Sequence, residues 1–292
     1  PRPVVPETAM SDFPDSLRRR LARPAAILGA GVSGRAVADT LGAAGFASVV
    51  YDAQGGNPTF GPDEASRHDL VVYSPGFAQS HPWLLAARRA GLQCLAELDF
   101  GALLWTGPAI AVTGTNGKTT LTEFLSFAHK RAGQDAIACG NVGLPFTALH
   151  ATVSNGSFLA VVEVSSFQAE DLRHFSPEAV LWTNFDEDHL DRHGELESYF
   201  RAKFRLIERM PPGGVLVVGE LVAHNVLGLA GVRAHKPWFS QQRLAQRRPR
   251  CVHHDAQIGS CEFLRQHRVV LRWHVAGERP GKHHDVGAAR EV

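Results

Sequence analysis

The sequence lacks several features that would place the protein in a definite class. It has no apolar run that approaches the roughly 20 residues needed to cross a bilayer. Its first residues also lack the apolar core of a secretory signal. The four cysteines are far apart and show no C-x-x-C spacing, which disfavours a disulfide framework or a zinc site. A net charge of +1 gives no basic field for nucleic acid or anionic membranes. We therefore expect a cytoplasmic monomer with no membrane insertion and no nucleic-acid partner.

The strongest functional pattern lies at residues 110–121, where an apolar strand, a glycine-punctuated turn and a helical pattern follow one another. Gly114 and Gly117 can adopt backbone angles closed to other residues, so successive N–H groups can converge on an anion. Lys118 would neutralise phosphates and Thr119 would bind Mg²⁺. The loop is a shortened form of the general phosphate-loop pattern, and an ordinary strand-to-helix turn is the alternative. The predicted ATP-binding residues are Gly114, Thr115, Asn116, Gly117, Lys118, Thr119 and Thr120.

A second glycine turn, G-A-G-V-S-G at residues 29–34, follows a small apolar strand and precedes a helical pattern. Asp52 ends the next strand, and together they match the dinucleotide-fold fingerprint, in which an acid can bind a ribose. Ser74 begins a turn that breaks a further strand, at the sheet edge where ligands gather. The same pattern also occurs where a strand simply connects to a helix that packs on it, without a bound ligand. It is compatible with a nucleotide, a nucleotide-sugar or, as a separate hypothesis, a nicotinamide-dependent oxidoreductase.

Charged residues at strand ends mark the second half of the chain. Glu163 interrupts a strongly apolar strand, where a carboxylate is costly unless it is paired or bound to a metal. Six acids and histidines crowd residues 186–193; we single out His189, although a solvated helix start with acids near its dipole is the alternative. Lys203 shares the apolar side of the following helix, which is unusual for a free lysine. Snorkelling of its long side chain would give the same pattern.

The chain length of 292 residues suits two domains, each with its own core. Strands alternate with helices, which predicts parallel sheets covered on both faces. We place an N-terminal Rossmann-like domain at 1–105 and a P-loop ATPase-like α/β central domain at 106–232, with an alternative end at 292. Residues 233–292 form an atypical Arg/His-rich tail. The predicted strands are 25–28, 48–51, 69–73, 93–95, 137–138, 158–164, 179–183 and 215–218, and the predicted helices include 35–44, 83–90, 121–132 and 196–210.

The motif set resembles the Mur ligases, which are ATP-dependent amide-bond ligases of peptidoglycan precursor synthesis. It comprises G-T-N-G-K-T-T, G-N-V-G-L-P, V-E-V-S-S-F-Q, N-F-D-E-D-H-L-D-R-H and Y-F-R-A-K-F. With the first-domain glycine turn, the resemblance covers residues 25–218. The S-S-F-Q motif is most similar to the branch that adds D-glutamate to UDP-N-acetylmuramoyl-L-alanine. The resemblance implies those two substrates, ATP, Mg²⁺ and an acyl-phosphate intermediate.

The same resemblance implies roles for individual residues. It implies catalytic roles for Lys118, His189 and Lys203, and carbamylation of Lys203, which would turn a cation into a carboxylate-like ligand. Thr119 and Glu163 would hold one Mg²⁺, and His189 and Lys203 would serve a second. The residues implied to bind the UDP-linked substrate are Ser33, Gly34, Asp52, Ser74, Asn141, Ser165 and Gln168.

The resemblance ends before the last stretch of the chain. Mur ligases have a third domain that closes over ATP, and residues 233–292 contain none of its motifs. An altered reading frame, a divergent part of the central domain or a basic extension would each explain this stretch, in which 269–275 could form a strand. We therefore expect the third domain to be absent. The alternative to an active ligase is a truncated, catalytically incomplete protein that keeps the nucleotide and UDP-substrate sites.

Overall fold

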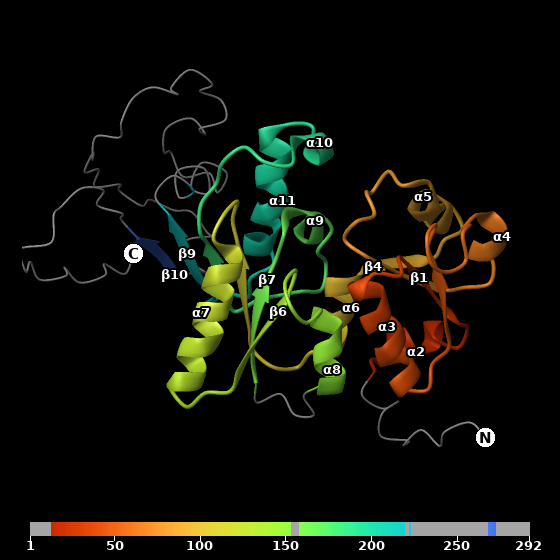
Figure 1. Ribbon diagram of the computed structural model, residues 1–292, viewed down its shortest axis with the longest axis horizontal. Helices are drawn as coiled ribbons and strands as arrows, with labels where there is room; N and C mark the ends of the chain where they lie inside the picture. Colours follow the sequence, from red (N-terminus) through yellow and green to blue (C-terminus); the bar gives the residue numbers. More distant parts are fainter. Residues whose placement is uncertain (1–12, 153–157, 220–221, 223–267, 273–292) are drawn as a thin grey trace, which may run out of the picture.

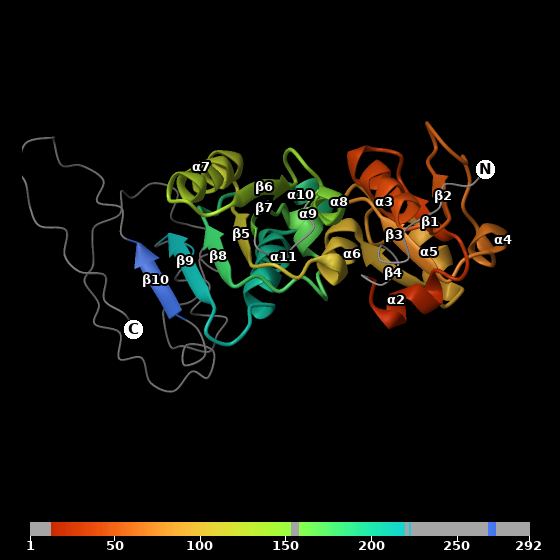
Figure 2. The same ribbon diagram turned by 90° about the horizontal axis from the view of Figure 1, so that it is seen from below.

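Two parallel β-sheets with flanking helices make up the described part of the computed structural model, which covers residues 13–152, 158–219, 222 and 268–272 (Figures 1 and 2). Residues 1–12 and most of the predicted tail lie outside these residues. Within them, none of the helices combines the length and the apolar character that a membrane crossing requires. The predicted fold class, α/β with parallel sheets, is confirmed.

The first sheet has the strand order β2-β1-β3-β4, with all neighbouring strands parallel. β1 and β3 are buried along their whole length, as expected for short apolar strands covered on both faces. We call the elements from α2 to α6 the first unit. They are α2 (Asp15–Arg20), β1 (Ala25–Leu28), α3 (Val32–Ala43), β2 (Ser48–Tyr51), α4 (Pro62–Ala65), β3 (Leu70–Tyr73), α5 (Pro82–Arg89), β4 (Gln93–Ala96) and α6 (Glu97–Leu104).

The second sheet has the order β10-β9-β8-β5-β7-β6 and is also parallel throughout. β5 lies between β7 and β8, and the apolar side of α7 packs on β5, β6 and β7. We call the elements from β5 to β10 the second unit. They are β5 (Ala109–Thr113), α7 (Lys118–Arg131), β6 (Ala136–Gly140), η1 (Phe146–Ala148), α8 (Leu149–Thr152), β7 (Leu159–Glu163), α9 (Ser166–Ala169), β8 (Ala179–Trp182), α10 (Leu190–His193), α11 (Leu196–Glu208), β9 (Val215–Gly219) and β10 (Arg268–Arg272).

β10 belongs to the stretch that the sequence marks as an atypical tail. A strand was expected at 269–275, and the structure forms one at Arg268–Arg272, parallel to β9. This part of the tail therefore continues the second sheet, which fits the alternative in which the central domain extends beyond 232. The domain boundaries themselves stay predictions.

Two helices begin three residues earlier than the sequence analysis placed them. α3 starts at Val32 rather than at 35, and α7 starts at Lys118 rather than at 121. In both cases the glycine turn passes directly into the helix, with Gly31 and Gly117 as N-caps. The apolar periodicity that marks a helix in sequence begins only after this first turn, so the pattern alone places the start too late.

Two buried carboxylates of α6 attach the first unit to the second. Asp99 accepts hydrogen bonds from the backbone N–H groups of Arg173, His174 and Phe175, at 2.7 to 3.1 Å. Glu97 accepts one from the N–H of Thr147 at 2.8 Å, and burial raises the pKa of its carboxyl. Both acids thus accept hydrogen bonds from backbone N–H groups of the second unit, and these bonds join α6 to η1 and to residues 173–175.

Gly34 sets the distance between α3 and the turn after β1. An ideal β-carbon at Gly34 would lie 1.8 Å from the carbonyl oxygen of Gly29. We expect Gly34→Ala to destabilise the protein by about 3 kcal/mol, because the methyl group must displace the helix from the turn. Gly42→Ala is the matched control on α3, since nothing lies within 4 Å of its ideal β-carbon. That change should be neutral or stabilise by up to about 1 kcal/mol. The urea unfolding midpoints of the two variants would be compared. Equal midpoints would contradict this packing role of Gly34.

Candidate functional site

The phosphate loop joins β5 to α7 at the middle of the second sheet. Its two glycines have positive φ angles, 144° at Gly114 and 78° at Gly117, which other residues rarely adopt. An ideal β-carbon on Gly114 would lie 1.9 Å from Thr183 Oγ1, so the loop runs directly against the end of β8. α7 then begins at Lys118 and continues for 14 residues, which directs its positive N-terminal end at the loop.

Two residues at the end of β8 hold the loop in shape. Thr183 Oγ1 donates a hydrogen bond to the carbonyl oxygen of Asn116 at 2.7 Å. The amide oxygen of Asn184 accepts one from the N–H of Asn116 at 2.8 Å. Neither Thr183 nor Asn184 was among the predicted site residues. Their position in the sequence could have indicated a role. They directly follow β8, the neighbour of the phosphate-loop strand β5, and precede the acidic residues 186–193.

Glu163 ends β7 beside the phosphate loop and is 2% exposed. Its Oε2 accepts a hydrogen bond from Thr119 Oγ1 at 2.7 Å, and its Oε1 accepts one from Asn141 Nδ2 at 2.9 Å. Among the described residues no lysine or arginine forms an ion pair with it. Within the described part of the chain, Glu163 is therefore not paired with a basic group, and its role as a metal ligand stays a prediction. Three predicted site residues instead meet within hydrogen-bonding distance.

This arrangement fits a hard divalent cation. A buried carboxylate with only neutral partners carries a large desolvation cost, which a cation would offset. Carboxylate and hydroxyl oxygens are the ligands that Mg²⁺ prefers, usually with water and phosphate oxygens completing the shell. The described residues contain no group of three or more His, Cys, Asp or Glu side chains placed to hold a metal. Thr119 and Glu163 would hold a metal here, with water and phosphate oxygens in its shell.

Lys203 reaches the phosphate loop from α11. It is 1% exposed, its Nζ donates a hydrogen bond to the carbonyl oxygen of Gly114 at 2.8 Å, and its Nζ lies 4.7 Å from the centre of the Tyr199 ring. Burial, with the positive charge of Lys118 as the next cause, lowers the pKa of Lys203 to about 7. Because the amine itself is buried, the snorkelling alternative is wrong. Tyr199 was missed as a site residue, although it lies one helical turn before Lys203.

Lys118 folds back onto its own loop. Its Nζ donates a hydrogen bond to the carbonyl oxygen of Thr115 at 2.9 Å, and its side chain is only partly buried. Of the other predicted nucleotide residues, Asn116, Thr119 and Thr120 are exposed at the same end of α7. The positive charge and the open helix end therefore lie on the same side of the loop, where an anion could bind.

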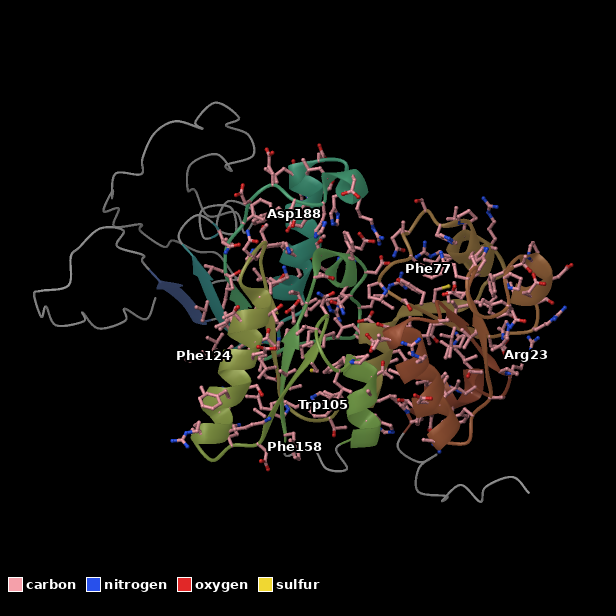
Figure 3. The ribbon with its side chains drawn as sticks, viewed as in Figure 1. Arg23, Phe77, Trp105, Phe124, Phe158 and Asp188 are labelled. Atoms are coloured by element: carbon pink, nitrogen blue, oxygen red, sulfur yellow. The ribbon has the colours of Figure 1, made fainter. Side chains whose placement is uncertain are left out.

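His189 lies on the loop between β8 and α10 and is exposed. Its φ of 53° makes it the one described non-glycine residue with a left-handed backbone, a conformation that often marks functional strain. Its Nε2 lies 3.4 Å from a carboxylate oxygen of Asp188, which is labelled in Figure 3. Its ring contacts Phe167 and Tyr199, with centroids 4.8 and 6.2 Å apart. Tyr199 therefore touches both His189 and Lys203.

In the first unit, the predicted residues gather at the carboxyl ends of β1, β2 and β3. The carboxylate of Asp52 accepts hydrogen bonds from the backbone N–H groups of Ala30, Gln54 and Gly55, at 2.7 to 3.2 Å, and these bonds lower its pKa, that of Ala30 most. Asp52 thus closes the glycine turn, a structural role that the sequence analysis did not foresee. Its role toward a ribose stays a prediction.

Ser74 follows β3 and faces the same turn. Its Oγ is buried and has no hydrogen-bond partner among the described residues. It lies 2.7 Å from the position of an ideal β-carbon on Gly29, whose φ is 103°. An unpartnered buried hydroxyl is unusual in a native protein and is satisfied if a ligand or water binds there. Ser33 lies in the first turn of α3 and is half-buried, and Gly34 next to it is buried.

The remaining predicted substrate residues, Ser165 and Gln168, form the capping box of α9. Ser165 Oγ accepts a hydrogen bond from the N–H of Gln168 at 3.3 Å, and the N–H of Ser165 donates one to Gln168 Oε1 at 3.0 Å. Their side chains are therefore engaged with each other. This cap fixes the segment that directly follows Glu163, and any substrate contact by the pair stays a prediction.

These features define a protein with a phosphate-loop site in one parallel-sheet unit and a glycine-turn site in another. The chain matches the model of the family described as Mur ligase middle domain over residues 112–277, more than half of its length. It therefore belongs to the Mur ligase family, and the resemblance noted in the sequence is confirmed. The match continues through β10 into the stretch that was described as an atypical tail.

Individual relatives agree with this family. The chain is 40% identical over 172 residues to a protein of Desulfotalea psychrophila named UDP-N-acetylmuramoylalanine--D-glutamate ligase, which covers 58% of this chain and 36% of that one. A protein of Aquifex aeolicus with the same name is 32% identical over 215 residues, covering 74% of this chain and 51% of that one. The chain thus spans between a third and about half the length of these relatives.

The fold also matches a solved structure. The UDP-N-acetylmuramate:L-alanyl-gamma-D-glutamyl-meso-diaminopimelate ligase of Neisseria meningitides aligns with a TM-score of 0.51 at 18% identity. The alignment covers 71% of this chain and 75% of that one. At this identity the likeness supports the arrangement of strands and helices, and it says nothing about the substrate.

Proposed function

We propose that the protein is an ATP-dependent amide-bond ligase that adds D-glutamate to UDP-N-acetylmuramoyl-L-alanine in peptidoglycan precursor synthesis. The observation that carries the proposal is the contact between Thr119 and buried Glu163, directly beside the lysine and glycines of the phosphate loop. Phosphoryl transfer needs this combination, because its catalysis consists mainly of positioning and charge neutralisation. The D-glutamate specificity is taken from the names of the relatives.

In the proposed reaction the terminal carboxylate of the UDP-linked substrate attacks the γ-phosphorus of ATP, which gives an acyl phosphate and ADP. The amine of D-glutamate then attacks the acyl carbon, the amide bond forms, phosphate leaves and the amine loses a proton to solvent. Lys118 would lie against the β- and γ-phosphates, and the α7 N-terminus would hold their oxygens.

Thr119 and Glu163 would hold Mg²⁺, which neutralises developing charge on phosphoryl oxygens when it is bound. His189 and Lys203 would serve a second metal ion, provided that Lys203 is carbamylated. The lowered pKa supports this role, because a neutral amine is the form that reacts with CO₂. Asn141 would orient Glu163, to which it already donates a hydrogen bond.

The UDP portion would bind across the glycine turn of the first unit, with the Ser74 hydroxyl as one donor or acceptor. The unpartnered hydroxyl of Ser74 supports this placement. The cytoplasmic location and the monomeric state stay predictions.

Phosphate release from MgATP tests the proposal, measured with UDP-N-acetylmuramoyl-L-alanine and with or without D-glutamate. We expect release that requires the UDP-linked substrate and increases with D-glutamate, accompanied by formation of the amide product. Release that is independent of the UDP-linked substrate would contradict a ligase. Binding of both ligands without release would instead establish the alternative, a catalytically incomplete protein that keeps both sites.

A further inference from the structure

Arg192 joins the two units through one side chain. It belongs to α10, just after His189, and its side chain is 13% exposed. One end of the guanidinium faces the second unit, where Nη2 donates a hydrogen bond to Glu170 Oε1 at 2.5 Å. The same group reaches the first unit, with Nη2 donating to the carbonyl oxygen of Phe77 at 3.1 Å and Nη1 to that of Gly76 at 3.4 Å. Arg192 was not among the predicted site residues.

The two carbonyl groups belong to the loop that leaves β3, at residues 74–79, which we call the β3 loop. Figure 3 shows Phe77 on this loop, on the side of the first unit that faces the second. The β3 loop begins at Ser74, the residue with the unpartnered hydroxyl at the glycine turn. A molecule bound at that hydroxyl would therefore lie at one end of the segment whose other part is held by Arg192.

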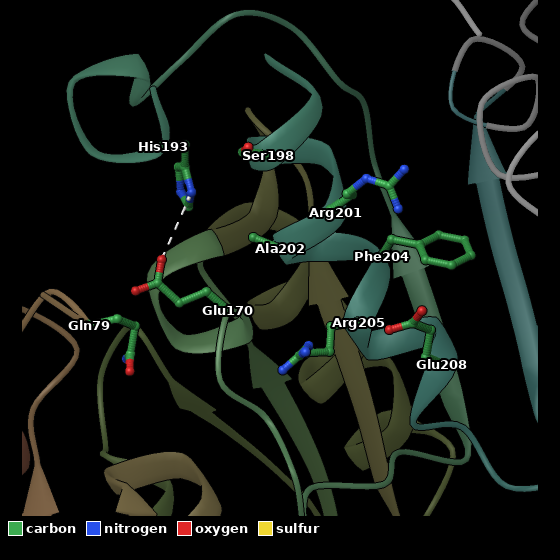
Figure 4. Close-up of a pocket in the computed structure, with 9 residues that line it drawn as sticks. All are labelled: Gln79, Glu170, His193, Ser198, Arg201, Ala202, Phe204, Arg205 and Glu208. Carbon is green, nitrogen blue, oxygen red and sulfur yellow. Dashed lines mark ion pairs between the residues drawn. The ribbon is translucent and has the colours of Figure 1, made fainter. Parts of the chain in front are cut away.

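The flat side of the guanidinium extends the connection toward His189. Its central carbon lies 4.6 Å from the centre of the Phe167 ring. Phe167 in turn packs against the rings of His189 and His193, at 4.8 and 5.7 Å between centroids. Glu170 lies 3.9 Å from His193, the contact shown in Figure 4 beside an open cleft. An uninterrupted series of contacts thus leads from the β3 loop through Arg192 and Phe167 to His189.

We propose that Arg192 is a positioning residue that couples the β3 loop of the UDP-substrate site to the placement of His189. The coupling rests on the proposed function for the identity of the ligands, but its contacts are formed in the protein alone. A planar guanidinium with five donors can hold two carbonyl groups, one carboxylate and an aromatic ring at the same time. A ligand that fixes the β3 loop would thereby restrict Arg192, Phe167 and His189 together.

A second link between the same units supplies the control. Asp171 Oδ2 accepts a hydrogen bond from the hydroxyl of Tyr73 at 2.6 Å and lies 4.0 Å from a nitrogen of Arg88. Among the contacts found in the described residues, Asp171 joins the units without touching Phe167 or His189. If Arg192 merely holds the units together, loss of either link should have the same effect. If Arg192 positions His189, only the loss of Arg192 should change the conformation of the loop that contains His189.

Hydrogen–deuterium exchange of the whole chain tests this without requiring turnover. In the ligand-free protein, Arg192→Ala should speed exchange in both 74–79 and 186–193 by roughly tenfold, the equivalent of one charge-assisted hydrogen bond. Asp171→Asn should speed exchange near 74–79 but leave 186–193 as in the parent. Arg192→Lys, which keeps the charge and loses the planar fork, should resemble the alanine variant. The proposal would be overturned if Arg192→Ala left the exchange rate of 186–193 unchanged. It would also be overturned if Asp171→Asn increased that rate as much as Arg192→Ala does.

Adding UDP-N-acetylmuramoyl-L-alanine separates this inference from the proposed function. In the parent, the ligand should protect both 74–79 and 186–193, whereas in Arg192→Ala it should protect only 74–79. Titration with MgADP in the presence of this ligand should show a coupling factor of about five or more in the parent, and Arg192→Ala should reduce it. If the parent binds neither ligand, the proposed function fails, while the ligand-free exchange pattern still decides the role of Arg192. Undiminished coupling in Arg192→Ala would overturn the inference even when both ligands bind.

Discussion

Replacing Lys118 with alanine is expected to reduce ATP-dependent phosphate release by two to three orders of magnitude, while binding of the UDP-linked substrate stays unchanged. A positioned charge that stabilises transferring phosphoryl oxygens is worth about 100- to 1,000-fold in rate. Lys118 is the first residue of α7, and its amine donates a hydrogen bond to its own loop, at the carbonyl oxygen of Thr115. The change therefore removes charge from the phosphate loop without disturbing the first unit.

The matched control for this prediction is Lys130→Ala in the last turn of the same helix. Lys130 is exposed and far along α7 from the phosphate loop, so its loss should change neither release nor binding. Phosphate release and calorimetric titration with UDP-N-acetylmuramoyl-L-alanine would be measured on both variants. A loss of UDP-ligand binding in Lys118→Ala, with an unchanged circular dichroism spectrum, would contradict the division of the two sites between the two units.

The sequence predicted the strands well because they are short apolar runs that end at glycine, proline or charged residues. β1 and β2 fall at the predicted residues 25–28 and 48–51, and the family motifs follow the carboxyl ends of β5, β6, β7 and β8. Helix starts were less accurate, because a helix that begins inside a glycine turn shows no apolar periodicity in its first turn. Short elements such as α4, α9 and α10 contain only four residues each, too few for any periodicity.

The candidate site was predictable where a residue type is unusual for its position. Glu163 in a buried strand and Lys203 on an apolar helix side both stand out in this way, and both prove to be buried polar groups beside the phosphate loop. Thr183, Tyr199 and Arg192 were missed because each is ordinary for its surroundings in sequence. Their importance arises from partners 67 to 116 positions away along the chain, which only the folded arrangement brings together.

The structure also changes how two predicted substrate residues are understood. Asp52 holds the glycine turn through three backbone N–H groups, and Ser165 caps α9 together with Gln168. Each could shape its site without touching a ligand. Substituting them would therefore alter binding through the loop conformation as well as through direct contact, and a loss of affinity alone would not assign a contact.

Lys203→Ala is expected to lower phosphate release by a factor of about 100 or more, because it removes a buried amine that donates a hydrogen bond to the phosphate loop at Gly114. The same Lys130→Ala protein serves as the control, and equal losses would remove Lys203 from the site. Lys203→Met, which keeps most of the buried volume, should be as inactive as the alanine variant. This would show that the amine, or the carbamate formed on it, is needed rather than the packing of its stem.

The pH dependence of Lys203 gives the second part of this prediction. With a pKa near 7, Lys203 holds fewer protons in the folded than in the unfolded state between about pH 7 and the ordinary lysine value near 10.4. In CO₂-free buffer this residue should therefore make stability increase with pH across that window, and the Lys203→Met protein should lack this contribution. Below pH 7 the amine becomes an ammonium, which cannot react with CO₂. Carbon-13 NMR with labelled bicarbonate should accordingly show a carbamate signal that declines as the pH falls through 7 and is absent in Lys203→Met. A signal of equal strength in both proteins would place the carbamate elsewhere.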